Sequence, residues 1–163
     1  MTETIHSVLI AYDFSTCADR ALGMGLAVAD RFQSTVIVLN VINRRDIAAI
    51  EQAVNRSLLV AERVSTADYV REYEADRTQE LKERLAQFPH ANLSPQAMLR
   101  IGDPVEEILE TAKAKNIDLI VMGARGRNRV SRLLTGSKAE TVFRLSPIPV
   151  LSVRLGGESA SSQ

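Results

Sequence analysis

Short apolar segments alternate with longer amphipathic segments along most of this chain. The short segments are nearly continuous in apolar residues and rich in β-branched ones, which is typical of strands covered on both faces. The longer segments repeat their apolar residues every three or four positions, the period of an α-helix. Strands are therefore expected at residues 7–12, 35–42, 95–101, 118–123 and 148–153. Helices are expected at residues 17–32, 103–116 and 136–145.

The long segment between the second and third expected strands contains no comparable strand. Its apolar residues follow a helical stripe from Ile47 to Ala61 and again from Tyr69 to Leu85. Two helices are expected, with a break near Ser65, where capping residues cluster. The residues leave open whether this segment is an ordinary crossover between strands or a mobile insertion beside the functional site.

The alternation of strands and helices predicts an α/β protein with a parallel sheet. We expect a five-stranded, doubly wound, Rossmann-like sheet with helices on both faces and the strand order 3-2-1-4-5. In such folds ligands bind beyond the carboxyl ends of the strands, where the strand order reverses. Asp13 and Gly123 each follow an expected strand, so both are expected at that edge. Residues 1–155 are expected to form a single domain, followed by a small, polar, disordered tail at 156–163.

The composition narrows the class of protein. The 163 residues suffice for one domain with a proper core, and basic and acidic residues balance at 20 each. That balance gives no reason to expect nucleic acid or an anionic membrane as a partner. No apolar run is long enough for membrane insertion, and the first seven residues do not have the pattern of a signal peptide. Cys17 is the only cysteine, which suits a reducing compartment, so we expect the cytoplasm. His6 and His90 are isolated, so no structural zinc site is expected.

The candidate chemistry is concentrated at the end of the fourth expected strand. Gly123 and Gly126 are followed, after nine residues, by Gly136 and Ser137. A glycine at a strand end permits a sharp turn and lets a ligand approach the backbone. Gly136 and Ser137 open a helix, whose unpaired N–H groups and positive dipole end favour a phosphate. The Ser137 hydroxyl can also contact a phosphate oxygen or a bound metal ion.

Several basic residues occupy or border the loop between these glycine pairs. They are Arg125, Arg127, Arg129, Arg132 and Lys138. Such a loop can fold over a polyphosphate and offset its charge. A structural explanation competes with this one, because Ser137 and Glu140 have the spacing of a capping box and the glycines can serve turns. The residues alone do not decide between the two.

The spacing G-x2-G-x9-G-[S/T] resembles the ATP-binding signature of the universal stress protein family. Residues 123–137 match that signature at every fixed position. The strand that leads into Gly123, the final strand at 149–153 and the first strand with its acidic turn at 8–13 are similar to the same family. The resemblance covers nearly the whole chain, is weakest from 43 to 95, and implies ATP, together with Mg²⁺, as the ligand.

The resemblance also implies roles for individual residues. Asp13 and Val41 would surround the adenine and ribose, the first glycine pair would line the ribose–phosphate turn, and the following helix start would hold the phosphates. Ser137 is the expected contact of Mg²⁺. Lys138 departs from the family, in which many members have a small apolar residue at this position. The candidate ATP-binding residues are Ala11, Tyr12, Asp13, Val41, Met122, Gly123, Arg125, Gly126, Arg127, Gly136, Ser137 and Lys138.

Three further features have competing explanations. Asp13 is either a ligand contact or a cap of the first helix, and its place at the expected ligand edge favours the contact. Gly23 and Gly25 begin a pattern similar to a dinucleotide fingerprint, but Val28 occupies the third glycine position. Close packing of the helix is therefore the better explanation for the two glycines. Cys17 is expected to begin the first helix, where the positive dipole end favours reactivity, but burial is the better explanation for this cysteine.

We expect a nucleotide-responsive regulatory or stress-resistance module, in which ATP changes the 124–135 loop and an unknown protein partner reads the change. The chain offers no evident general base for the phosphates, and the resemblance implies weak ATPase activity, so hydrolysis is expected to be slow or absent. The alternative is an ATP-using enzyme, a phosphotransferase or an adenylyl-transferring one, for whose acceptor no motif is found. The final strand at 148–153 is apolar on both faces. The resemblance implies that two such strands pair in a homodimer, alone or within a higher oligomer.

Overall fold

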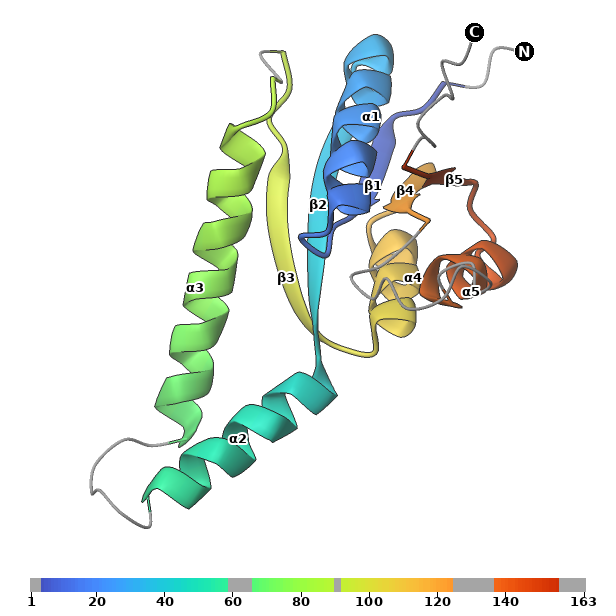
Figure 1. The fold of residues 1–163 in the computed structure, drawn as a ribbon. Coiled ribbons are helices and arrows are strands. Elements are labelled where there is room, and N and C mark those ends of the chain that lie inside the picture. The colour runs from blue at the N-terminus through green and yellow to red at the C-terminus, as the bar shows by residue number, and fades with distance from the viewer. Residues whose placement is uncertain (1–3, 59–65, 90–91, 125–136, 156–163) are drawn as a thin grey trace, which may run out of the picture.

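The computed structural model describes residues 4–58, 66–89, 92–124 and 137–155 (Figure 1). Within them, strands and helices follow one another in the predicted order. The strands are β1 (Ser7–Ala11), β2 (Thr35–Asn43), β3 (Gln96–Gly102), β4 (Leu119–Gly123) and β5 (Val150–Val153). The helices are α1 (Thr16–Phe32), α2 (Arg44–Leu58), α3 (Thr66–Ala86), α4 (Pro104–Ala114) and α5 (Ser137–Leu145). The tail expected at 156–163 lies outside the described residues.

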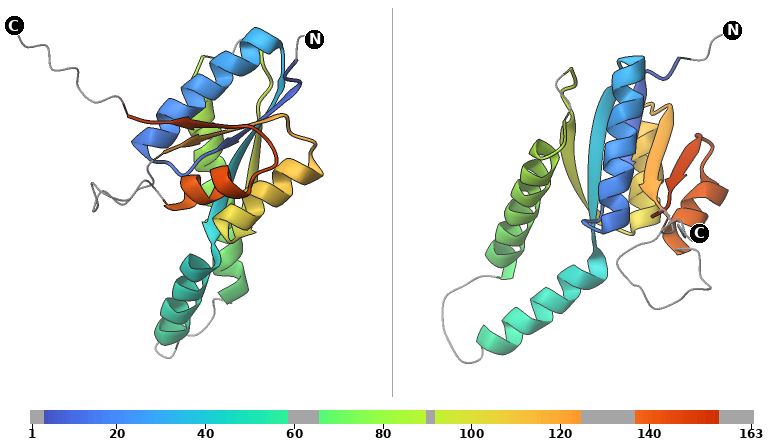
Figure 2. Two further views of the ribbon diagram at one scale, coloured as in Figure 1. Left: turned by 90° about the vertical axis from the view of Figure 1, so that its right-hand side faces the viewer. Right: turned by 45° about the horizontal axis from the view of Figure 1, so that its top comes forward.

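The strands form a parallel sheet with the order β3-β2-β1-β4-β5, which confirms the predicted topology. Helices α1 and α3 pack on one face of the sheet, and α4 and α5 pack on the other (Figure 1). Helix α2 extends away from the sheet beyond the end of β2 (Figure 2). The arrangement is the expected doubly wound, Rossmann-like one, with β3 and β5 as its edges.

Each face of the sheet has its own apolar core. The core between the sheet and helices α1 and α3 includes Val8, Ile10, Val36 and Val38 of the sheet, Leu22 of α1 and Leu81 of α3. The core between the sheet and helices α4 and α5 includes Leu9, Leu39 and Ile120 of the sheet, Ile108 of α4 and Val142 of α5. Neighbouring residues of one strand enter different cores because successive side chains of a strand point to opposite faces. This double burial is the physical reason for the nearly continuous apolar segments in the sequence.

Helix α1 is capped by a serine and packed through a glycine. Ser15 is the N-cap, and its Oγ accepts a hydrogen bond from the Ala18 N–H at 3.1 Å. Gly25 faces β1, where an added Cβ would lie 2.6 Å from the Cδ1 of Ile10. Close packing therefore explains Gly25, as predicted, but not Gly23, where an added Cβ would make only an ordinary contact of 3.8 Å with Phe88. Cys17 is buried, also as predicted.

The segment between β2 and β3 forms two helices, as predicted, and the break expected near Ser65 lies outside the described residues. Leu81 and Leu85 of α3 are buried in the core that α1 shares. Helix α3 is therefore an ordinary crossover helix that covers the sheet, whereas α2 projects from it. Among the described helices, none combines the length and the apolar content that crossing a membrane requires.

The last strand is shorter than expected. The structure begins β5 at Val150, whereas the sequence pattern places its start at Ile148. Pro149 has no N–H to donate to the ladder, so the strand begins only after it. Its carbonyl still accepts a hydrogen bond from the Ile120 N–H at 3.0 Å, which ties the segment to β4.

Candidate functional site

The carboxyl ends of β1 and β4 lie side by side at the point where the strand order reverses. Ala11, the last residue of β1, pairs with Met122 of β4 on one side and with Leu39 of β2 on the other. The chain leaves β1 toward β2 and leaves β4 toward β5, so the crossovers diverge here and open the edge to a ligand. Asp13, which follows the end of β1, and Gly123, the last residue of β4, therefore lie at the same edge.

The floor of this edge is apolar. Ala11, Val41 and Met122 all belong to the core on the α4 and α5 face, with Met122 buried and the other two half-buried. Ala139, in the first turn of α5, packs against the same core. Three of the predicted ligand residues and the start of the predicted phosphate-binding helix are thus brought to one surface.

Asp13 is exposed and shapes the turn between β1 and α1. Its Oδ1 accepts a hydrogen bond from the Ser15 N–H at 3.1 Å, which is the pattern of an Asx turn. The cap of α1 is Ser15, so the alternative in which Asp13 itself caps the helix is wrong. For Asp13 Oδ2, no hydrogen-bond partner is found among the described residues. The turn therefore presents a carboxylate at the ligand edge.

Tyr12, the residue before Asp13, anchors this turn in the core on the α1 face of the sheet. Its side chain is 2% exposed and points into the core on the α1 face, where the hydroxyl donates to Asp19 Oδ1 at 2.5 Å. Burial, and next the hydrogen bond to Asp19, raise the pKa of the tyrosine well above its ordinary value. The Tyr12 N–H donates to the Leu39 carbonyl, and its carbonyl accepts from Asn40 Nδ2, both at 2.8 Å. Tyr12 therefore holds the strand end in place rather than presenting its ring to the edge.

Phe14 has a backbone conformation that the sequence did not predict. Its φ is 62°, in the left-handed region that side chains other than glycine rarely adopt. The ring packs edge-on against Tyr12, with centroids 5.0 Å apart, and the guanidinium of Arg77 lies 4.7 Å from the centroid. The residue type gives no signal of this conformation, because the contacts that hold it come from a distant helix.

Close packing requires a glycine at position 123, which the sequence did not indicate. A Cβ added there would lie 2.9 Å from the Cβ and 3.0 Å from the carbonyl carbon of Cys17. Gly123 does not have a positive φ, and neither does any other glycine among the described residues. Close approach of α1, rather than a left-handed turn, therefore requires the glycine at the end of β4.

The remaining candidates are only partly described. Arg125, Gly126, Arg127 and Gly136 lie outside the described residues. Ser137 begins α5, but its side chain, and with it the proposed capping box, is not described. Lys138 follows and is exposed. The start of α5 still supplies backbone N–H groups that have no partner within the helix.

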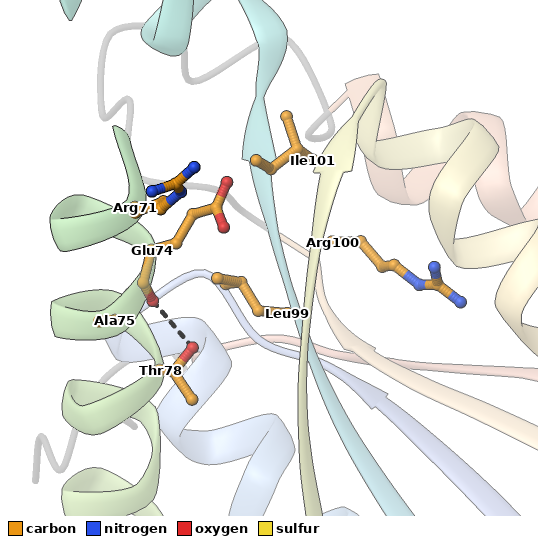
Figure 3. Close-up of a pocket in the computed structure, with 7 residues that line it drawn as sticks. All are labelled: Arg71, Glu74, Ala75, Thr78, Leu99, Arg100 and Ile101. Atoms are coloured by element: carbon orange, nitrogen blue, oxygen red, sulfur yellow. Dashed lines mark hydrogen bonds between the residues drawn. The ribbon is translucent and has the colours of Figure 1, made fainter. Parts of the chain in front are cut away.

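A hollow lies elsewhere in the molecule, away from this edge. A cavity of ≈ 580 Å³ opens between α3 and β3, lined by Arg71, Glu74, Ala75, Thr78, Leu99, Arg100 and Ile101 (Figure 3). Its strand is an edge of the sheet, separated from β1 by β2. This cavity is therefore not the predicted site. Of the described residues, no three of the types His, Cys, Asp or Glu come close enough together to hold a metal ion.

Parallel strands in the order 3-2-1-4-5, with a carboxylate and a helix start at the reversal point, define a doubly wound α/β protein of the Rossmann-like class. The model of the universal stress protein family matches residues 4–154. The chain therefore belongs to the universal stress protein family.

Relatives align along nearly their full length. A universal stress protein of Thermus aquaticus is 32% identical, over 91% of this chain and 98% of its own. One of Methanocaldococcus jannaschii is 27% identical, over 94% of this chain and 98% of its own. The solved structure of the Methanocaldococcus jannaschii protein, 26% identical, superposes with a TM-score of 0.72 and covers 95% of this chain and 99% of that one.

Two more distant solved structures share the fold. A universal stress protein in complex with cAMP is 20% identical, with a TM-score of 0.62, and covers 94% of this chain and 100% of that one. A universal stress protein family protein of Arabidopsis thaliana with AMP bound is 18% identical, with a TM-score of 0.59, and covers 97% of both chains.

Proposed function

We propose that this protein binds ATP at the shared carboxyl edge of β1 and β4 and acts as a nucleotide-responsive regulatory or stress-resistance module in the cytoplasm. The observation that carries the proposal is the pairing of Ala11 with Met122, which gathers the apolar floor, the Asp13 carboxylate and the start of α5 at one edge. Nucleotides have these three parts in the same order: an apolar ring, a ribose with hydroxyl donors, and anionic phosphates. The complexes of two relatives with cAMP and AMP support a nucleotide at this fold.

Each part of the edge has a proposed role. The half-buried side chains of Ala11 and Val41 offer apolar surface to the adenine, and Asp13 accepts hydrogen bonds from the ribose. The backbone N–H groups at the start of α5 bind phosphate, since they lack partners in the helix and stand at its positive end. Lys138 is exposed beside them and adds a positive charge. The spacing of Gly123, Gly126, Gly136 and Ser137 matches the ATP-binding signature of the family, and ATP is proposed as the nucleotide for that reason.

We further propose that Mg²⁺ accompanies ATP through the Ser137 hydroxyl. A hydroxyl and phosphate oxygens are hard oxygen ligands of the kind that Mg²⁺ prefers. The ion would neutralise part of the phosphate charge, while Ser137 and the N–H groups of α5 orient the phosphates. Hydrolysis is proposed to be slow or absent, because the sequence offers no evident general base for a water aimed at the phosphates.

The proposed assembly is a homodimer through β5. This strand is an edge of the sheet, and apolar side chains lie exposed on α5 and just after the strand. Phe143 is 66% exposed, Leu145 56% and Leu155 46%. An edge strand with apolar neighbours is usually paired or covered, and a second copy of β5 would pair it.

The proposed ligand is tested by equilibrium titration with ATP, with and without Mg²⁺. The informative variant is Asp13→Asn, since an amide oxygen can still accept from the Ser15 N–H while the charge is lost. We expect binding by the wild type and binding roughly tenfold weaker in Asp13→Asn, the loss of one charge-assisted hydrogen bond. The matched control is Glu110→Gln on the exposed side of α4, which should bind as the wild type does. Failure of the wild type to bind any adenine nucleotide would overturn the proposal.

A further inference from the structure

The turn that presents Asp13 is held from two sides. On the sheet side, the buried Asn40 donates through Nδ2 to the Tyr12 carbonyl at 2.8 Å, which fixes the backbone just before Asp13. On the other side lies Phe14, whose left-handed backbone has an energetic cost for any residue with a side chain. Such a conformation persists only where its surroundings hold it. The contacts around Phe14 therefore decide whether the Asp13 turn keeps its shape.

Those contacts come from α3. The guanidinium of Arg77 lies 4.7 Å from the centroid of the Phe14 ring and 5.8 Å from that of Tyr73. The Arg77 side chain is only 19% exposed, and its Nη1 pairs with Glu80 at 2.9 Å. Its Nε is buried and has no hydrogen-bond partner among the described residues. Because the cation is largely removed from water and lies over aromatic faces, its attraction to the Phe14 ring is stronger than at an exposed site.

A second contact ties the same helix to the same strand end. The Nε of Arg84, two turns further along α3, lies 3.7 Å from Asp19 Oδ1. The same Asp19 oxygen accepts the hydrogen bond from the Tyr12 hydroxyl. Tyr12 and Phe14 flank Asp13 in the chain, so each neighbour of Asp13 is linked, directly or through Asp19, to an arginine of α3. Arg77 differs from Arg84 in that it touches the strained residue itself.

We propose that Arg77 is a positioning residue for the nucleotide site, holding the Asp13 turn in its binding geometry by stacking on Phe14. The inference rests on the proposed function for its consequence, which is tighter ATP binding. Because coupling between two sites is reciprocal, ATP bound at Asp13 also stabilises the contact of α3 with the turn.

The variants are chosen to separate this contact from the stability of α3. Arg77→Met keeps an unbranched apolar stem and removes the cation, whereas Arg77→Lys keeps a cation that can lie over the ring. The matched control is Arg71→Met on the same helix, because the Arg71 side chain is 77% exposed and pairs with Asp68 on the surface. A general effect of losing an arginine from α3 would appear in the control, and an effect through Phe14 would not.

The first measurement is hydrogen exchange of the Ser15 amide without nucleotide, because this N–H donates to Asp13 Oδ1 within the turn. We expect exchange roughly threefold to tenfold faster in Arg77→Met, near-normal exchange in Arg77→Lys, and no change in Arg71→Met. The Glu107 amide donates a hydrogen bond to the Asp103 carbonyl at the start of α4, far from the Asp13 turn in the sequence. Its exchange rate reports any destabilisation of the whole fold and should be the same in all four proteins. Equal exchange of Ser15 in Arg77→Met and the wild type would overturn the inference.

The second measurement is the affinity for ATP in the same four proteins. We expect a Kd roughly threefold to tenfold higher in Arg77→Met, largely restored in Arg77→Lys and unchanged in Arg71→Met. If the wild type binds ATP and Arg77→Met binds it equally well, the inference fails while the proposed function stands. If the wild type binds no nucleotide, the proposed function fails, and the exchange of Ser15 still decides whether Arg77 holds the turn.

Discussion

An added Cβ at Gly123 would lie 2.9 Å from the Cβ of Cys17, so the end of β4 meets the first turn of α1 with no room for a side chain. This contact joins the glycine of the proposed nucleotide signature to the helix that follows the Asp13 turn. Gly123 is thus required by packing, whatever ligand lies at the edge. Loss of ATP binding after a change at Gly123 would by itself not identify a ligand contact.

We predict that Gly123→Ala is destabilised by about 1–3 kcal/mol, the range for overpacking a close contact. The Cys17 atoms nearest the new methyl group include backbone, which cannot turn away as a flexible side-chain end would. The free energy of unfolding in urea measures the loss. Gly23→Ala is the control, since its new Cβ would lie 3.8 Å from the nearest Phe88 atom, an ordinary contact. That variant should keep its stability or gain about 0.5–1 kcal/mol from helix propensity, and an equal loss in both variants would contradict the explanation.

Tyr12 should remain protonated at a pH where exposed tyrosines ionise. Burial, followed by the hydrogen bond to Asp19, raises its pKa, so its contribution to stability is present below the unfolded pKa of about 10 and is lost as pH rises through the folded pKa. Titration of the tyrosinate absorbance measures this directly. In the folded protein, Tyr12→Phe should leave the absorbance change near pH 10 unaltered, because Tyr12 stays protonated there. A smaller change in Tyr12→Phe would show that Tyr12 ionises normally.

Asp118 should stabilise the folded protein at neutral pH, and this stabilisation should be lost in acid. Its carboxylate accepts hydrogen bonds from the His6 N–H at 2.8 Å, the Ser7 N–H at 3.0 Å and the Ser7 hydroxyl at 3.1 Å. These bonds, the one from His6 first, hold its pKa below the ordinary value. The stabilisation is therefore complete above the unfolded pKa of about 4 and disappears as pH falls through the lower folded value. Asp118→Asn should unfold more easily than the wild type at neutral pH, with the difference shrinking below about pH 4. A difference that is the same at both ends of this range would point to a cause other than the carboxylate charge.

Ser152→Pro should disrupt the proposed dimer and leave the fold intact. The carbonyls of Pro149 and Val153 accept from β4, so the odd-numbered residues of β5 face that strand. Because backbone groups alternate along a strand, the Ser152 N–H points to the open edge, where proline removes a donor without breaking the ladder to β4. Light scattering should give twice the chain mass for the wild type and a single chain mass for Ser152→Pro, with similar circular dichroism. A wild type that is monomeric at micromolar concentration would contradict the assembly.

The sequence by itself determined the elements of this fold and their order. Apolar runs such as the one from Val8 to Ile10 indicate strands buried on both faces, and Asp103 followed by Pro104 marks a helix start that the structure reproduces. The alternation of strands and helices then implies parallel pairing and the edge at which Asp13 and Gly123 lie. These features are predictable because they depend on the period of the local chain and on capping, which involve neighbours in sequence.

Only the tertiary structure decided why particular residues occupy the edge. Gly123 lies in close contact with Cys17, and the Tyr12 ring lies in the core beneath α1. The sequence indicates neither contact. The stacking of Arg77 on Phe14 joins segments far apart in the chain. No local pattern encodes such contacts, because they depend on which side chains meet when the helices pack on the sheet.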